Sequence, residues 1–209
     1  MTIRQRIATF MLVGSLFCGG AVAVDANTAS AAQHKSEAVA KAPDEVATAA
    51  TAALAAMGTD QFPARLDDVV VLVAIRLGAV GGRLHQAWTA ADQPHQVALL
   101  SALSQVGVRY HRNASQPGVA FDCSGLTSYA WGQAGVALNR QSGSQIRSVA
   151  PRTLDTAQAG DLAYYPGHVM IWLGVDSLIV HAPQPGHDVE VGDISSRRIN
   201  RTKFGNPIG

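Results

Sequence analysis

FDCSGLTSYAW, residues 121–131, contains the only cysteine of this 209-residue chain beyond residue 18. Its apolar residues recur at helical spacing, and Gly135 stands where the end of a helix is expected. The pattern predicts a turn followed by a helix, with Cys123 in the first helical turn. Free backbone N–H groups and the positive end of the helix dipole favour a thiolate there, the form of cysteine that attacks carbonyl carbons. A lone cysteine is more often a small buried apolar side chain, so the residues downstream must decide.

The composition is that of a globular protein. Hydrophobic residues make up 47% of the chain, which is enough for a substantial core. The formal net charge is +1, from 16 basic and 15 acidic residues. Nucleic-acid-binding proteins normally carry a basic surplus or stripe, so this balance argues against DNA or RNA as a partner.

The N-terminus has the pattern of a secretion signal peptide. Arg4 and Arg6 precede a mostly apolar run over residues 7–24, and small residues that suit cleavage follow. We assign residues 1–31 to this signal and expect a secreted protein of the cell envelope, periplasmic or bound to the cell wall, without stable membrane insertion after cleavage. An uncleaved membrane anchor is the alternative, because the run is barely long enough to cross a bilayer.

Removal of the signal leaves Cys123 as the only cysteine, since Cys18 is lost with it. Exported proteins usually pair their thiols. An unpaired Cys123 is therefore a structural residue, an intermolecular link or a reactive thiol.

Residues 32–95 form an alanine-rich segment that we expect to be helical. Residues 32–59 predict a weakly packed helix or linker, because they offer little apolar surface. In residues 65–88 apolar side chains recur every three to four positions, which predicts two successive helices with a break around Gly81-Gly82. A further amphipathic helix is expected over residues 96–106.

From residue 161 the pattern changes to short strands bounded by turn residues. Pro166-Gly167 separates the first strand from the second, and residues 174–177 form the next turn. We expect strands over residues 161–165, 168–173, 178–181 and 189–191.

The second of these turns decides where two histidines lie. If it pairs Leu173 with Leu178, His168 and His181 occupy diagonal positions on one face of the hairpin, with Cα atoms roughly 7–8 Å apart. Two imidazoles can hydrogen-bond across that distance. A turn of odd length would move one histidine to the opposite face.

A lone cysteine and two neighbouring histidines supply the parts of cysteine acyl-transfer chemistry. Cys123 is the candidate nucleophile, and His168 is the candidate base that takes the thiol proton. His181 would orient the ring of His168. The backbone N–H of Cys123 and the hydroxyl of Tyr110 are candidate donors to the oxyanion.

Five motifs, in this order, resemble the NlpC-type cell-wall cysteine peptidases, and especially their actinobacterial and mycobacterial members. They are FDCSGLTSYAW (121–131), RQSGSQ (140–145), GDLAYY (160–165), HVMIWLG (168–174) and HAP (181–183). The resemblance spans residues 97–191. It implies an α+β, papain-like catalytic domain over residues 96–209, with helices packed on an antiparallel sheet and the nucleophile at a helix N-terminus. The helical segment of residues 32–95 would precede this domain.

The resemblance also implies roles for individual residues. Cys123, His168 and His181 correspond to the nucleophile, the base and the third member of the catalytic set. Candidate residues that contact substrate or the oxyanion are Tyr110, Asp122, Ser124, Arg140 and Ser142. The implied activity is that of a peptidoglycan D,L-endopeptidase, a thiol protease that cleaves stem peptides, most often between D-γ-glutamate and meso-diaminopimelate. No metal and no cofactor is implied.

The sequence departs from the family pattern in the loop before the cysteine. Arg109, Arg112, Asn113 and Ala114 stand where members usually have Pro-Tyr, an aromatic residue and paired glycines. Because this loop borders the cleft, we expect an altered substrate preference.

Three other functions remain open. One is an amidase or acyltransferase on the same scaffold, and another is a catalytically weak module that binds peptidoglycan. A metal site of Cys123 with His168, His181 and His187 is the third, and it lacks the close ligand spacing typical of such sites. A further hypothesis is that the helical segment covers the cleft until it is processed.

Overall fold

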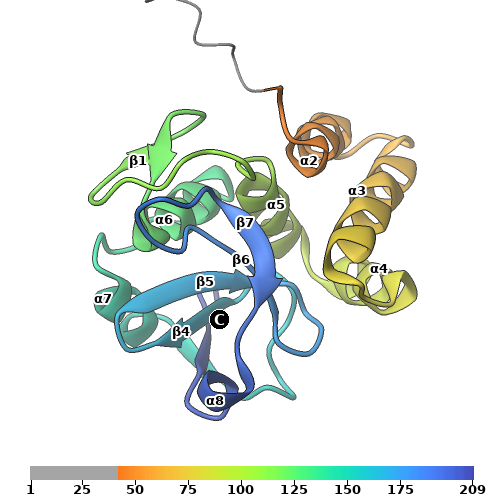
Figure 1. Ribbon diagram of the computed structural model, residues 1–209. Coiled ribbons are helices and arrows are strands. Elements are labelled where there is room, and N and C mark those ends of the chain that lie inside the picture. The colour runs from red at the N-terminus through yellow and green to blue at the C-terminus, as the bar shows by residue number, and fades with distance from the viewer. Residues whose placement is uncertain (1–41) are drawn as a thin grey trace, which may run out of the picture. The chain divides into compact units, whose positions relative to one another are not determined.

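The computed structural model describes residues 42–209 (Figure 1). The expected signal peptide at residues 1–31 lies outside the described residues. Within residues 42–209 no helix has both the length and the apolar character needed to cross a membrane.

Four helices open the described chain. They are α2 (Glu45–Ala56), α3 (Phe62–Leu77), α4 (Gly81–Ala90) and α5 (Gln93–Leu103). The apolar stretch at residues 69–73 is helical, in agreement with the helices predicted for residues 65–88. Val69, Val70 and Val73 are buried while Val71 is 54% exposed, which is the one-sided burial of an amphipathic helix.

Two details of this segment differ from the sequence-based expectation. The break between α3 and α4 falls at Gly78, whose positive φ of 60° ends α3, whereas Gly81 and Gly82 begin α4. Helix α2 is not weakly packed, because Val46, Ala50 and Ala53 are fully buried. Small alanine side chains let α2 pack closely against α3 and α5.

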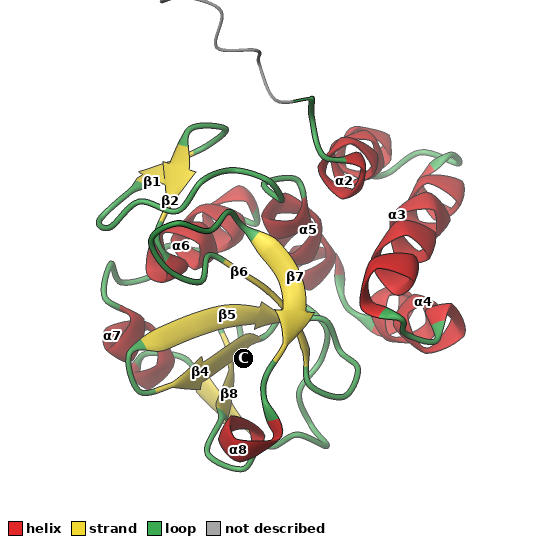
Figure 2. Cartoon of the chain, in the orientation of Figure 1, coloured by secondary structure: helices red, strands yellow, loops and turns green. Residues whose placement is uncertain are grey.

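The second half of the chain forms a six-stranded antiparallel sheet with strand order β3-β8-β4-β5-β6-β7. Strands β8, β4, β5, β6 and β7 are labelled in Figure 2. Its strands are β3 (Ala150–Arg152), β4 (Leu162–Tyr165), β5 (His168–Trp172), β6 (Leu178–His181), β7 (Glu190–Asp193) and β8 (Lys203–Asn206). The four strands expected from the sequence are present within one or two residues. Strands β3 and β8 were not predicted, and β8 pairs with both β3 and β4.

Three helices and a small hairpin complete the fold: α6 (Cys123–Gln133), α7 (Ser142–Arg147), α8 (Ser196–Ile199), and β1 (Ser115–Gln116) with β2 (Ala120–Phe121). Helix α6 packs between α5 and β5. Its Leu126 and Trp131 are fully buried in a core that also includes Val169 and Ile171 of β5. The predicted α+β class, with helices on an antiparallel sheet, is confirmed.

The same core includes residues of α2, α3 and α4. Trp88 of α4 donates a 2.8 Å hydrogen bond to the carbonyl oxygen of Leu173, and Arg83 forms an ion pair with Asp176. The domain division at residues 95 and 96, and the hypothesis that the helices cover the cleft, stay predictions.

Candidate active site

Asp122 holds the start of α6. Its carboxylate accepts hydrogen bonds from the backbone N–H of Gly125 at 2.7 Å and of Asn113 at 2.8 Å. The first bond caps the helix by satisfying one of its free N–H groups, and the second ties the preceding loop to the cap. Cys123 is the first residue of α6 and thus lies in the first helical turn, where the sequence predicted it.

Arg140 forms hydrogen bonds with the capping residue Asp122 and with Ser124. Its guanidinium donates to both carboxylate oxygens of Asp122, at 3.0 and 2.7 Å, and to the hydroxyl of Ser124 at 2.9 Å. The hydrogen bond with Asp122 raises the pKa of Arg140. A planar guanidinium suits this two-point contact, so the RQSGSQ segment is attached directly to the residues that flank Cys123.

Tyr110 lies within electrostatic range of the same cluster. Burial raises the pKa of its hydroxyl, and the charges of Asp122 and of Cys123 when ionised act in the same direction. The structure thus brings together the predicted residues Tyr110, Asp122, Cys123, Ser124 and Arg140. Ser142 begins α7, which packs against β4 and β5.

The thiol of Cys123 is partly buried, and its protonation differs from our expectation. Burial raises the pKa of the thiol, although hydrogen bonds from the backbone N–H groups of Val169, Ser124 and Cys123 itself act to lower it. The predicted preference for a thiolate is wrong for this resting state, because desolvation of the anion outweighs the helix terminus. Attack by this sulfur on a carbonyl carbon would therefore require a neighbouring base.

The β5–β6 hairpin carries the candidate base and the histidine that contacts it. Ile171 pairs with Val180 and Trp172 with Ile179, which is the register that aligns Leu173 with Leu178. The Nε2 of His168 lies 2.8 Å from the Nδ1 of His181. The prediction that the two imidazoles share one face is confirmed. Val169, whose N–H contacts the sulfur, directly follows His168.

Both histidines are neutral near pH 7. Burial lowers the pKa of His168 to about 4, with a further contribution from the positive charge of Arg198. Burial lowers the pKa of His181 to about 3, with contributions from His168 and His187. A neutral His168 can accept a proton, which is what a base for the Cys123 thiol requires.

Comparison with known proteins identifies this part of the chain. Residues 107–205 match the model of the NlpC/P60 family. They form an NlpC/P60 domain.

Two curated relatives illustrate the similarity. Dipeptidyl-peptidase 6 of Lysinibacillus sphaericus is 36% identical over 101 residues, which cover 46% of this chain and 35% of that protein. A probable endopeptidase of Mycobacterium tuberculosis is 39% identical over 99 residues, which cover 46% of this chain and 25% of that protein. The match thus spans only about a third and a quarter of these relatives.

A solved structure agrees at the level of the fold. The NlpC/P60 family protein from Bacillus cereus has a TM-score of 0.50 and 23% identity, over 55% of this chain and 40% of that one.

The NlpC/P60 domain carries further residues beside His168 that sequence reasoning missed. The ring of Tyr165 lies 5.3 Å from the ring of His168, and Arg198 of α8 donates a 3.0 Å hydrogen bond to the Tyr165 hydroxyl. Tyr165 could have been found from the sequence, because the Pro166-Gly167 turn pairs it with His168. Nothing near residue 198 points to the site, since only the tertiary fold brings α8 there.

Gln145 is another missed residue of the NlpC/P60 domain. It is fully buried, accepts a 2.7 Å hydrogen bond from the Thr127 hydroxyl, and donates to the carbonyl oxygens of Ser124 and Asn139 at 3.0 and 2.8 Å. It therefore joins the first turns of α6 to the segment that carries Arg140.

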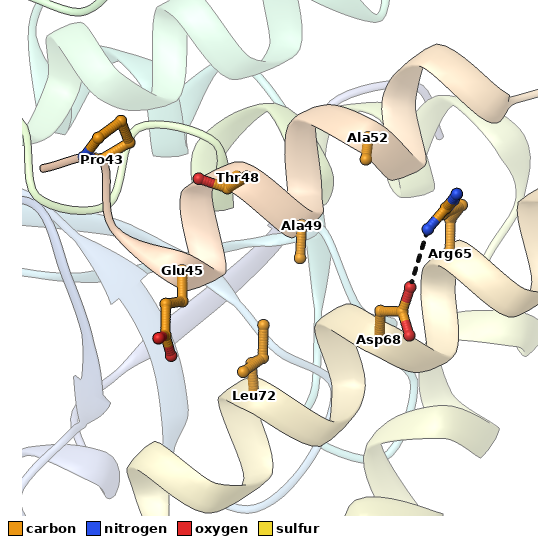
Figure 3. A pocket seen from close by; sticks show the side chains of 8 residues that line it. All are labelled: Pro43, Glu45, Thr48, Ala49, Ala52, Arg65, Asp68 and Leu72. Carbon is orange, nitrogen blue, oxygen red and sulfur yellow. Dashed lines mark hydrogen bonds and ion pairs between the residues drawn. The ribbon is translucent and has the colours of Figure 1, made fainter.

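An open groove of about 500 Å³ lies apart from these residues, between α2 and α3 (Figure 3). Ala49 and Leu72 face it, and Arg65 and Asp68 form an ion pair at its edge. None of the candidate catalytic residues lines it. Within residues 42–209 no three His, Cys, Asp or Glu side chains are grouped so that they could share a metal ion.

Proposed function

We propose that this protein is a secreted cysteine peptidase that cleaves peptidoglycan stem peptides in the cell envelope. One observation carries the proposal. The neutral imidazole of His168 is held by His181 at 2.8 Å, and the next residue, Val169, donates a backbone hydrogen bond to the protonated thiol of Cys123. Nucleophile, base and orienting group thus come from α6, β5 and β6.

The reaction begins with proton transfer from the Cys123 thiol to Nδ1 of His168, because Nε2 is engaged by His181. The sulfur attacks the carbonyl carbon of the scissile amide, and the backbone N–H of Cys123 with the Tyr110 hydroxyl stabilises the oxyanion. As the C–N bond breaks, His168 returns the proton to the departing amine and a thioester remains. Water then attacks the thioester, gives a proton to His168, and the thiol is restored as the carboxylate leaves.

The substrate is inferred from the family and its named members. The NlpC/P60 match and relatives named probable endopeptidases support hydrolysis of a cell-wall peptide. The resemblance of the five motifs points to the bond between D-γ-glutamate and meso-diaminopimelate. Tyr110, Asp122, Ser124, Arg140 and Ser142 are the residues that we propose border the bound stem peptide.

Digestion of purified peptidoglycan tests this function. Wild type and a Cys123→Ala variant are incubated with the polymer, and the soluble fragments are identified by mass spectrometry. We expect fragments cut between D-glutamate and meso-diaminopimelate from wild type only. Absence of fragments from both proteins, with retained binding to the polymer, would indicate a binding module. Fragments cut at the sugar–peptide amide would indicate an amidase, and equal fragments from both proteins would exclude Cys123 as nucleophile.

A further inference from the structure

Strand β7 places an acidic residue beside the histidine pair. His181 and Glu190 are directly opposite each other in the antiparallel β6–β7 register, so their side chains lie on the same face. The Oε1 of Glu190 lies 3.5 Å from the Nε2 of His181. The same His181 ring contacts His168 through its other nitrogen, Nδ1. Glu190, His181 and His168 thus form a chain of side chains from three strands. These strands, β7, β6 and β5, are neighbours in the sheet (Figure 1).

A carboxylate beside Nε2 of His181 favours one direction for the hydrogen bond between the two imidazoles. A neutral imidazole has one N–H donor and one acceptor nitrogen, whereas an ionised carboxylate only accepts. Facing Glu190, His181 is favoured to carry its proton on Nε2, which leaves Nδ1 as the acceptor. His168 must then donate from Nε2 to His181. The remaining nitrogen of His168, Nδ1, is left with its lone pair free.

We propose that Glu190 is a positioning residue that selects the tautomers of His181 and His168 and thereby leaves Nδ1 of His168 free to accept the Cys123 proton. The catalytic consequence rests on the proposed function, whereas the tautomers can be measured without turnover.

The opposite tautomers would disable the base. If His181 carried its proton on Nδ1, it would donate to Nε2 of His168, and the proton of His168 would move to Nδ1. His168 would then present an N–H rather than a lone pair to the thiol. Because burial keeps both rings neutral, their tautomers are what Glu190 can control.

Side-chain substitutions at position 190 separate this role from a structural one. Glu190→Gln keeps an oxygen that accepts from Nε2 of His181, so it should preserve the wild-type tautomers. Glu190→Lys offers only donors, so it should favour a lone pair on Nε2 of His181. The hydrogen bond between His181 and His168 would then run in the opposite direction. Asp193→Lys is the matched control, because Asp193 lies on the same strand and pairs with Leu178, three residues before His181.

The readout is the nitrogen-15 spectrum of histidine-labelled protein, with wild type expected to protonate Nε2 of both rings. We expect Glu190→Lys to move the protons of both rings to Nδ1, and kcat on peptidoglycan fragments to fall about 100-fold with little change in KM. Glu190→Gln should retain the wild-type spectrum and most of the activity, as should Asp193→Lys. Thermal unfolding of each variant verifies that it is folded. If Glu190→Lys is not folded, Glu190→Ala replaces it, and we expect that variant to show a mixture of tautomers.

Wild-type tautomers in folded Glu190→Lys, or in Glu190→Ala where it replaces that variant, would overturn the proposal. If wild type cleaves no peptidoglycan but the tautomers respond as expected, the proposed function fails and the role of Glu190 stands. If wild type cleaves and the substitutions leave both spectrum and rate unchanged, the role of Glu190 fails alone.

Discussion

The guanidinium of Arg198 lies 4.7 Å from the centre of the Tyr165 ring and donates a hydrogen bond to its hydroxyl. The same ring also packs against His168, at 5.3 Å between ring centres. A cation is thus held against the aromatic side chain that packs on the proposed base, where it opposes a second positive charge on His168.

Arg198→Gln is expected to raise the pKa of His168 from its value of about 4, because loss of the cation makes the imidazolium less unfavourable. The acidic limb of the kcat/KM profile should move to higher pH with it. A histidine titration followed by NMR measures the shift directly. Arg197→Gln, one residue earlier in α8, is the charge-matched control, and an equal shift in both variants would contradict a specific effect of Arg198.

His181→Ala is expected to lower kcat by about 10²-fold or more, since Nε2 of His168 loses the partner that orients its ring. His181→Asn should retain more activity, because its amide oxygen can accept from the same N–H. Steady-state kinetics on a stem-peptide substrate compares the two. Equal activities would mean that orientation of His168 does not depend on a polar neighbour at position 181.

Another histidine, His95, is expected to stabilise the fold most at low pH. Its Nδ1 lies 2.7 Å from Asp92 and its Nε2 lies 3.1 Å from Asp161, and His95 and Asp161 are fully buried. Burial lowers the pKa of His95, but hydrogen bonds and charge at Asp161 and Asp92 outweigh it and leave the pKa raised. A raised folded-state pKa stabilises the fold below the unfolded pKa of about 6.5, and this contribution is lost as pH rises through the folded value.

Asp161→Asn should therefore lower the free energy of unfolding by about 3 kcal/mol near pH 6 and by less near pH 9. Urea unfolding at the two pH values measures the difference. In a His95→Gln background the same substitution should lose its pH dependence, and a dependence that persists there would place its origin outside the His95 cluster.

Two glycines of α6 test whether the position of Cys123 depends on close packing between the start of α6 and the loop at Ala114. A Cβ on Gly125 would collide with the carbonyl oxygen of Ala114, whereas a Cβ on Gly132 would meet no atom within 4 Å. Gly125→Ala should therefore destabilise the protein and lower kcat, because the start of α6 must move away from the loop. Gly132→Ala should stabilise it by about 0.5–1 kcal/mol through helix propensity. Measurements of the unfolding temperature and kcat of both variants test these expectations. Similar values for Gly125→Ala and Gly132→Ala would show that the backbone around Ala114 can shift to accommodate the added methyl group.

Much of the fold follows from short-range patterns. The helix that begins at Cys123 and the strands on either side of Pro166-Gly167 were predicted because spacing of apolar residues and turn chemistry act over a few residues. The β5–β6 register was left open between even and odd turns, and the four-residue turn at 174–177 settles it. Strands β3 and β8 were missed because they are short and pair with partners distant in sequence.

The sequence alone determined which side chains could act as nucleophile, base and orienting group, since these depend on residue type and local periodicity. Tertiary structure decided their protonation and their neighbours. Burial, which depends on packing from the whole chain, keeps the Cys123 thiol protonated and both imidazoles neutral. Arg198 and Glu190 reach the histidines only because α8 and β7 fold back onto the sheet, and no local pattern encodes contacts made over such separations.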